Sequence, residues 1–145
     1  MIIIDTNVVS EIVKLSPSQA VIDWFALQKL PDLYTTTITQ AEVLYGIELL
    51  PKGRRRSALQ SAMVGIFAQT FADRVLPFDE ASAYAFAMIA AGHRSSGRTI
   101  GELDSQVAAI ALSHRATLAT RNTKDFRYCG IELINPWDDA GAPRA

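Results

Sequence analysis

The sequence predicts an α/β fold, with a mostly parallel sheet covered by helices on both faces, and two observations lead to this prediction. Short apolar runs alternate along the chain with longer segments whose apolar residues recur at helical spacing. The first run, residues 1–4, is apolar at successive positions, which is typical of a strand buried on both faces. The length of 145 residues suits one domain. We expect that domain to cover residues 1–139, followed by a loose tail over residues 140–145.

The first half of the chain is expected to contain two strands, residues 1–4 and 33–37, and three helices. Thr6 and Asn7 offer caps for the first helix. Pro17 opens the second helix, whose apolar side chains fall on one face. The third is expected to start at Thr39 and to run through Leu50, because a proline and a glycine follow.

The second half is expected to contain three helices and three short strands. Apolar residues at helical spacing predict one helix from Arg54 to Asp73. Asp79 caps an alanine-rich helix through about Ala91, and Gly101 precedes another over residues 102–114. The strands are expected at residues 75–78, 117–120 and 131–134.

Composition excludes several classes of protein. The chain has 14 Lys and Arg residues against 15 Asp and Glu residues, a net charge of −1, so phosphate binding would need a local basic patch or a bound cation. Its one cysteine, Cys129, excludes an internal disulfide and a CxxC zinc site. The N-terminus lacks the basic region of a signal peptide, and the longest uncharged stretch, residues 57–72, is too polar for a membrane span. We expect a cytoplasmic protein with no membrane contact.

Four acidic residues are expected where parallel strands end, which is where α/β sheets bind ligands. Asp5 directly follows the first strand, and Glu42 lies early in the helix after the second. Asp104 begins the helix after Gly101, and Asp125 follows the strand at residues 117–120.

Each of these acids also has an ordinary structural explanation. Asp5 can cap the first helix, and Glu42 completes a capping-box pattern with Thr39. Asp104 suits the positive end of its helix, and Asp125 suits a turn. The case for a site therefore depends on all four acids occurring together.

Clustered carboxylates repel one another, and a divalent cation relieves that repulsion. Ligands that are all oxygen favour Mg²⁺ or Mn²⁺ over zinc or copper. A cation held in this way activates water and clamps a phosphate. The chain contains no glycine-rich phosphate loop, GxSxG turn or HExxH motif to suggest other chemistry.

Several stretches then match a known pattern in order. The chain resembles the PIN-domain ribonucleases, and within them the VapC or FitB type of toxin from bacterial type II toxin–antitoxin pairs. The stretches that carry the resemblance are IDTNVVSE at residues 4–11, TQAEVLYGI at 39–47, LDSQVAAIA at 103–111, ATRNTKDF at 119–126 and NPW at 135–137.

The resemblance implies an α/β/α sandwich and an endoribonuclease that depends on Mg²⁺ or Mn²⁺. It assigns the cation to Asp5 and Asp104, with Glu42 and Asp125 completing the catalytic acids. By the same resemblance, water attacks the phosphorus and leaves a 5′-phosphate and a 3′-hydroxyl. Three neighbouring residues are expected to orient the carboxylates by hydrogen bonds: Thr6, Asn7 and Asn122.

The expected partners are RNA, a small DNA-binding antitoxin and a second copy of the chain. Four arginines are candidate phosphate contacts: Arg54, Arg55, Arg56 and Arg121. Four apolar residues, each expected to be in the core, are also candidates for a groove that holds an antitoxin helix: Trp24, Phe25, Leu27 and Leu30.

Other functions fit less well. A haloacid dehalogenase-like domain would need an acid where Asn7 stands, and a receiver domain would need a further acid beside Asp5. The stronger alternative is a PIN-like module that has lost catalysis and only binds RNA or a partner.

Overall fold

The computed structural model describes residues 1–138, so the predicted tail and the last residue of the predicted domain lie outside the described residues. Five parallel strands form one sheet in the order β3-β2-β1-β4-β5. The strands are β1 (Ile2–Ile4), β2 (Leu33–Thr36), β3 (Val75–Leu76), β4 (Thr117–Ala119) and β5 (Leu133–Ile134). The prediction of an α/β fold on a parallel sheet is confirmed. The apolar first run forms β1, which lies at the centre of the sheet.

Helices connect these strands. The α-helices are α1 (Thr6–Ile12), α2 (Gln19–Ala26), α3 (Thr37–Glu48), α4 (Arg54–Gly65), α5 (Glu80–Ser95), α6 (Glu102–Ser113) and α7 (Thr123–Phe126). A short 3-10 helix, η1 (Leu30–Asp32), precedes β2, and a π-helical turn, η2 (Ile66–Thr70), follows α4. No helix within residues 1–138 is both long enough and apolar enough to cross a membrane.

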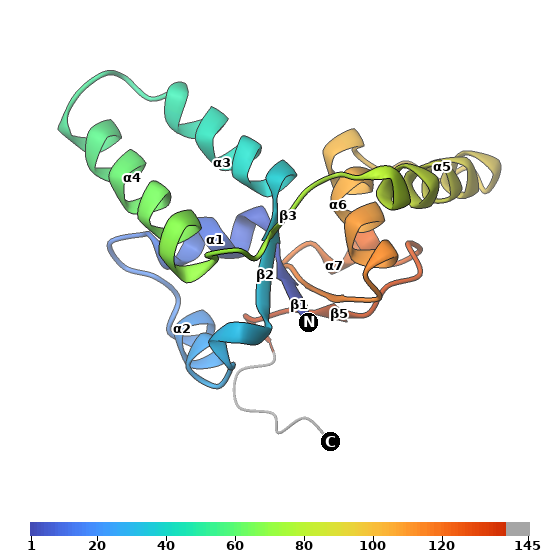
Figure 1. The fold of residues 1–145 in the computed structure, drawn as a ribbon, viewed down its shortest axis with the longest axis horizontal. Coiled ribbons are helices and arrows are strands. Elements are labelled where there is room, and N and C mark those ends of the chain that lie inside the picture. Colours follow the sequence, from blue (N-terminus) through green and yellow to red (C-terminus); the bar gives the residue numbers. More distant parts are fainter. Residues whose placement is uncertain (139–145) are drawn as a thin grey trace.

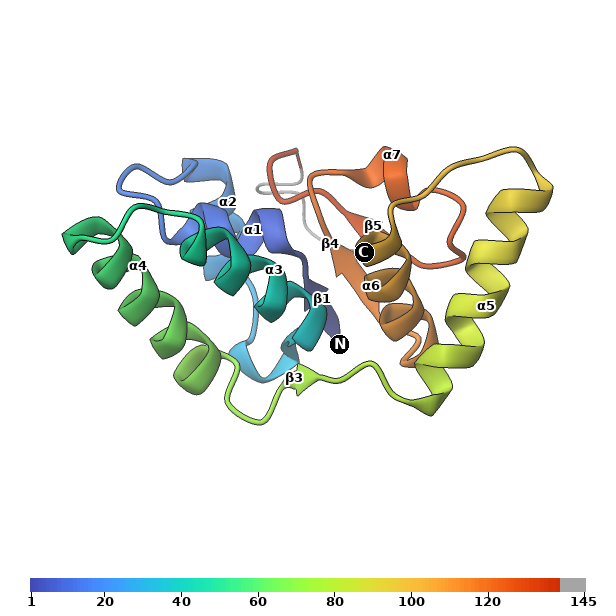
Figure 2. The same ribbon diagram turned by 90° about the horizontal axis from the view of Figure 1, so that it is seen from above.

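The sheet separates two apolar cores, and β1 contributes to both. Ile2 and Ile4 pack with residues of α1 to α4, whereas Ile3 packs with residues of α5 and α6 on the opposite face. Figures 1 and 2 show the α3–α4 pair and α5 extending to opposite sides of the sheet. Side chains alternate between the faces of a strand, so a run that is apolar at every position requires helices on both sides.

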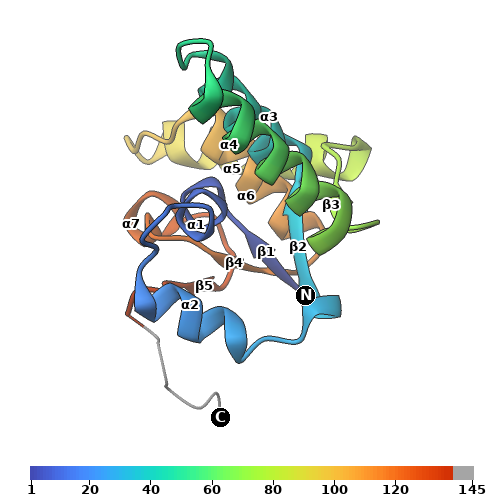
Figure 3. The same cartoon turned by 90° about the vertical axis from the view of Figure 1, so that its left-hand side faces the viewer.

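The α1 helix lies between two other helical layers on its side of the molecule. Figure 3 shows α1 with α3 and α4 on one side and α2 on the other, and α1 contacts both α2 and α3. Val8 and Val9 of α1 are fully buried in this core. The packing fixes the start of α1, and with it the residue that joins α1 to the central strand.

Two predicted helix starts are wrong, for one physical reason. The cap of α1 is Asp5, whose side chain accepts the Thr6 N–H, so Thr6 and Asn7 lie inside the helix. The cap of α3 is Thr36, which accepts the Thr39 N–H, so Thr39 and Glu42 form no capping box. In both cases a polar residue at the end of the strand caps the helix, since Thr36 is the last residue of β2 and Asp5 directly follows β1.

The predicted helix from Arg54 to Asp73 is also shorter than expected. Regular α-helix ends at Gly65, the π-helical turn follows, and Asp73 has a positive φ of 59°. The turn places Phe67 and Phe71 in the core, with Phe71 fully buried. Sequence periodicity cannot separate an α-turn from a π-turn, because both keep apolar residues on one face.

Candidate active site

The candidate site lies at the carboxyl edge of β1, where the connections of the sheet diverge. From β1 the chain moves to β2 and β3 on one side, and it later returns to β4 and β5 on the other. Such a switch point leaves a crevice beyond the strand ends. Ile4 pairs with Ala119, so the residues that follow them, Asp5 and Thr120, meet at this edge.

Asp5 is held in one orientation from several directions. Its Oδ1 accepts the Thr6 N–H at 2.8 Å, and its Oδ2 accepts the Thr120 hydroxyl at 2.7 Å and the Asn7 amide at 3.2 Å. The residue is only 4% exposed. Burial raises the pKa of Asp5, and the three hydrogen bonds only partly offset that effect. A positive charge placed beside this carboxylate would therefore stabilise its ionised form.

Glu42 reaches the same edge from α3. Its Oε1 accepts the Thr6 hydroxyl at 3.1 Å, and the same hydroxyl lies 3.4 Å from that of the buried Thr39. Burial raises the pKa of Glu42, and the nearby charge of Asp5 raises it further. Thr6 therefore connects the two acids, which agrees with the predicted orienting role.

Asp104 shows that all four acids share one electrostatic environment. It lies in the first turn of α6. Its pKa is raised to about 6, first by burial and then by the charges of Asp5, Glu42 and Asp125. The helix N-terminus, which favours a carboxylate, does not prevent this rise. Burial and the repulsion of neighbouring carboxylates thus both act on this acid, beyond its ordinary position at a helix start.

Asp125 occupies the exposed side of the cluster. It belongs to the single turn of α7, and its N–H donates to the Asn122 carbonyl at 3.0 Å. It therefore has the turn position that an ordinary reading predicts. Its charge also contributes to the raised pKa of Asp104, after burial and the charges of Asp5 and Glu42.

Sequence reasoning missed Thr120 as a functional residue. Its buried hydroxyl donates to Asp5 and accepts the Asn7 amide at 3.2 Å and the Asn122 N–H at 3.1 Å. Asn7 in turn accepts the Arg121 N–H at 3.0 Å. Thr120 sits one position beyond β4, as Asp5 does beyond β1, and this shared position was the clue in the sequence.

Among residues 1–138, no cationic side chain forms an ion pair with the carboxylates of this cluster. Within residues 1–138 the ion pairs are Lys14 with Glu11 and Arg56 with Glu48, both outside the cluster. The same residues contain no set of three or more His, Cys, Asp or Glu side chains placed to ligate one ion directly. Magnesium suits this arrangement, since it keeps several waters and binds through one or two carboxylates. The donor set therefore fits a partly hydrated Mg²⁺ or Mn²⁺.

The predicted phosphate contacts fall in two places. Arg54, Arg55 and Arg56 begin α4, after the end of α3 that lies away from the sheet (Figures 1 and 2). Arg56 is already paired there with Glu48 at 2.6 Å. The backbone N–H of Arg121 instead bonds to Asn7 near Asp5, and its guanidinium lies 4.9 Å from the centre of the Trp137 ring.

Other predicted features are now placed. Burial raises the pKa of Cys129 to about 11, with a further contribution from Asp104, so its thiol is a poor nucleophile at neutral pH. Trp24 is in the core, as expected, and Phe25 packs against it. Leu27 and Leu30 are 66% and 49% exposed, so the expectation that they belong to the core is wrong.

Comparison with known sequences agrees with this geometry. Residues 2–130 match the PIN domain family. The chain is 40% identical to the VapC ribonuclease Y4jK of Sinorhizobium fredii, over 97% of this chain and all of that protein. It is 37% identical to the toxin FitB of Neisseria gonorrhoeae, over 96% of this chain and all of that protein.

Solved structures show the same fold. The crystal structure of FitAcB from Neisseria gonorrhoeae matches 94% of this chain and 99% of its own with a TM-score of 0.89 and 36% identity. The structure of VapBC from Salmonella typhimurium bound to DNA matches with a TM-score of 0.77 over 93% of this chain and 97% of its own. At 22% identity, the second likeness concerns the fold alone.

Proposed function

The chain belongs to the PIN domain family, and from this premise we propose that it is a metal-dependent endoribonuclease of the VapC/FitB type. The observation that carries the proposal is the cluster of Asp5, Glu42, Asp104 and Asp125 at the carboxyl edge of the sheet. The other three carboxylates contribute, after burial, to the raised pKa of Asp104. Within residues 1–138, no cationic side chain forms an ion pair with the cluster. Carboxylates that repel one another in this way favour a divalent cation, and the bound cation can in turn bind a phosphate.

The proposed roles follow from how each side chain is held. Asp5 and Asp104 ligate Mg²⁺ or Mn²⁺ directly, and Glu42 acts directly or through a bound water. A cation here supplies an activated water and offsets the charge of the phosphate. Asp125, on the exposed side, positions water or assists a second cation. Thr6, Asn7 and Asn122 keep the acids oriented, the last through its N–H bond to Thr120.

RNA binding needs positive charge around this acidic centre. Arg121 is the proposed phosphate contact nearest to the acids, since its own N–H bonds to Asn7. Arg54 and Arg55 are exposed at the start of α4, where they would meet a more distant part of the strand. Arg56 is proposed as a weaker contact, because Glu48 already neutralises it.

We further propose that a small DNA-binding antitoxin inhibits the protein and that the toxin forms a homodimer in the cytoplasm. The toxin FitB is 37% identical to this chain, and the structure of FitAB bound to a DNA fragment supports a partner that binds DNA. Leu27 and Leu30 are exposed apolar candidates for that contact.

The direct test is cleavage of total bacterial RNA by the purified protein in Mg²⁺, Mn²⁺ or EDTA, beside Asp5→Asn and Asp104→Asn. We expect discrete fragments that require the cation and disappear in both variants. Cleavage that persists in EDTA or in both variants would rule out the acidic mechanism. Binding of Mn²⁺ and RNA with no cleavage would instead favour the alternative, a catalytically silent RNA-binding module.

A further inference from the structure

The structure contains a stacked pair that the proposed mechanism does not use, and one member lies on the segment that leads into the helix of Asp104. The guanidinium of Arg98 lies 3.6 Å from the centre of the Tyr128 ring. Both residues are exposed, Tyr128 by 54%. They come from different parts of the chain, the segment before α6 and the segment after α7.

Two local features place Arg98 on the segment that leads to Asp104. Gly97 has a φ of 68°, which turns the chain after α5, and the Arg98 N–H donates to the His93 carbonyl at 2.8 Å. Three residues later, Gly101 faces Asp104 so closely that a Cβ on it would lie 3.5 Å from the Asp104 carboxylate.

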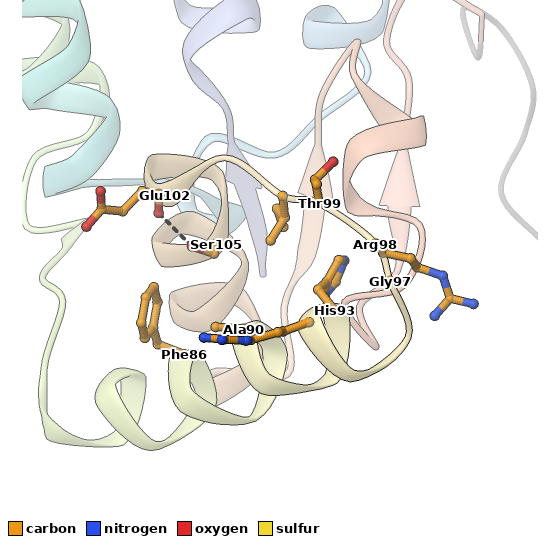
Figure 4. Close-up of a pocket in the computed structure, with 10 residues that line it drawn as sticks. Phe86, Ala90, His93, Gly97, Arg98, Thr99, Glu102 and Ser105 are labelled. Atoms are coloured by element: carbon orange, nitrogen blue, oxygen red, sulfur yellow. Dashed lines mark hydrogen bonds between the residues drawn. The ribbon is translucent and has the colours of Figure 1, made fainter.

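Arg98 also borders a groove but does not fill it. The segment 97–102 and α5 line a groove of about 560 Å³. Figure 4 shows Arg98 pointing away from this groove, whereas His93 lies within it. The orientation of Arg98 is therefore set by the Tyr128 ring, and its planar face and charge are presented at the surface.

An acidic centre repels the RNA that it must cut, so flanking cations have to hold the strand. Within residues 1–138, Arg98 has no ion pair with a carboxylate, so its charge is available for a phosphate. Arginine planes and aromatic rings also stack on RNA bases that are free of a duplex. Stacking on Tyr128 limits the freedom of the Arg98 side chain, which lowers the entropy cost of binding.

We propose that Arg98 and Tyr128 form a binding subsite for an unpaired RNA nucleotide of the strand that leads to the acidic cluster. The pair stacks on the base and the Arg98 N–H groups contact the adjoining phosphate. This inference rests on the proposed ribonuclease function, and it adds a contact outside the acidic cluster that holds the RNA strand. Arg98 and Tyr128 are positioning residues and take no part in the chemical step.

The test measures binding of a fluorescein-labelled single-stranded RNA of mixed sequence, in Mg²⁺, to the Asp5→Asn protein, which leaves the RNA intact. On that background we expect Tyr128→Leu and Arg98→Lys each to weaken binding by about tenfold, as loss of one stacked base does. Tyr128→Phe keeps the ring and retains affinity. Arg94→Lys is the matched control, since Arg94 lines the same groove but stacks on no ring within the described residues.

A second readout uses the protein with Asp5 intact. Arg98→Lys should raise KM for RNA cleavage and leave kcat nearly unchanged, because the pair binds substrate and does not touch the reacting atoms. A duplex of the same sequence should bind less tightly and respond little to Tyr128→Leu. Thermal melts of each variant identify any that fail to fold.

The inference is overturned if Arg98→Lys and Tyr128→Leu bind single-stranded RNA as tightly as their parent, or if Arg94→Lys weakens binding as much. In either case metal-dependent cleavage by the unchanged protein would leave the ribonuclease proposal intact. If the unchanged protein neither cuts nor binds RNA, both proposals fail together.

Discussion

Two carboxylates at opposite ends of α1, Glu11 and Asp5, differ in their surroundings. The first is paired with a cation, whereas the second is buried without one among the described side chains. Glu11 pairs with Lys14 at 2.6 Å and accepts the Ser18 N–H at 2.9 Å, and these contacts lower its pKa. Asp5 receives hydrogen bonds from neutral groups, and burial raises its pKa. Hydrogen bonds orient a buried carboxylate, but a nearby positive charge is needed to neutralise it. Asp5 lacks that charge among the described side chains, and this difference supports the proposal that it is a functional acid.

The largest expected difference between the two ends of α1 is in catalysis. Asp5→Asn should lower RNA cleavage by at least about a hundredfold, the upper range for residues that merely support a metal ligand. Glu11→Gln keeps an acceptor for Ser18 and should leave cleavage nearly unchanged. Initial rates at saturating Mg²⁺ check both. Equal losses in the two variants would mean that the comparison does not separate function from structure.

Loss of one orienting hydroxyl should have the next largest effect. Thr120→Val removes the donor to Asp5 and the acceptor for Asn7 and Asn122, at nearly unchanged volume. We expect cleavage or Mn²⁺ affinity to fall by about 10- to 100-fold, as for other groups that orient metal ligands. Thr120→Ser keeps the hydroxyl and should retain most activity. A fully active Thr120→Val protein would contradict this role.

For stability, substitution of the ion-paired Glu11 should have the larger cost, and substitution of an acid in the cluster should have none. Glu11→Ala breaks the ion pair and leaves the Ser18 N–H without its acceptor, so the free energy of unfolding should fall by about 1–3 kcal/mol. Asp104→Asn removes one of several mutually repelling charges and should make the metal-free protein more stable. Urea denaturation in EDTA measures both. A destabilised Asp104→Asn protein would show that the carboxylate serves the fold.

The pH dependence should also differ between the two regions. The pKa of Asp104 in the folded protein, about 6, exceeds its ordinary value of 3.8, so the folded state binds the proton more tightly. That contribution to stability is complete below pH 3.8 and is lost as the pH rises through about 6. The free energy of unfolding of the metal-free protein should therefore increase as the pH falls from 7 to 5, and Asp104→Asn should reduce this increase.

Glu11 has the opposite sign. Its lowered pKa contributes stability that is present above its ordinary value of 4.5 and is lost as the pH falls through the lower folded pKa. Its effect therefore belongs to a more acidic range than that of Asp104. Thermal melts in EDTA across pH 3 to 8 compare the two. Added Mg²⁺ should stabilise the protein more at pH 7 than at pH 5, where protons compete for the carboxylates.

The smallest expected effect concerns Arg121, whose backbone N–H bonds to Asn7. Arg121→Ala should weaken RNA binding in the same way for all sequences and should reduce the slope of log affinity against log salt concentration by about one. Arg54→Ala, at the start of α4, should change the affinity less. A salt titration of RNA binding to the Asp5→Asn protein distinguishes them, and an equal effect of the two would place RNA along α4 as well.

By itself, the sequence determined the strands, most helices and the acids at strand ends. These are local properties: residues 1–4 are apolar without a break, and Asp5 follows them directly. Helix starts were less predictable. Thr36 and Thr39 are both good caps, and only the end of β2 decides that Thr36 takes this position.

Only the tertiary structure decided which acids act together and what charge state they favour. Thr120 became a partner of Asp5 because β4 pairs beside β1, although 115 positions separate the two residues in the chain. The raised pKa of Asp104 depends on charges brought from β1, α3 and α7. Electrostatic energy depends on distance through space and on burial, and neither can be read from residues that lie far apart in the sequence.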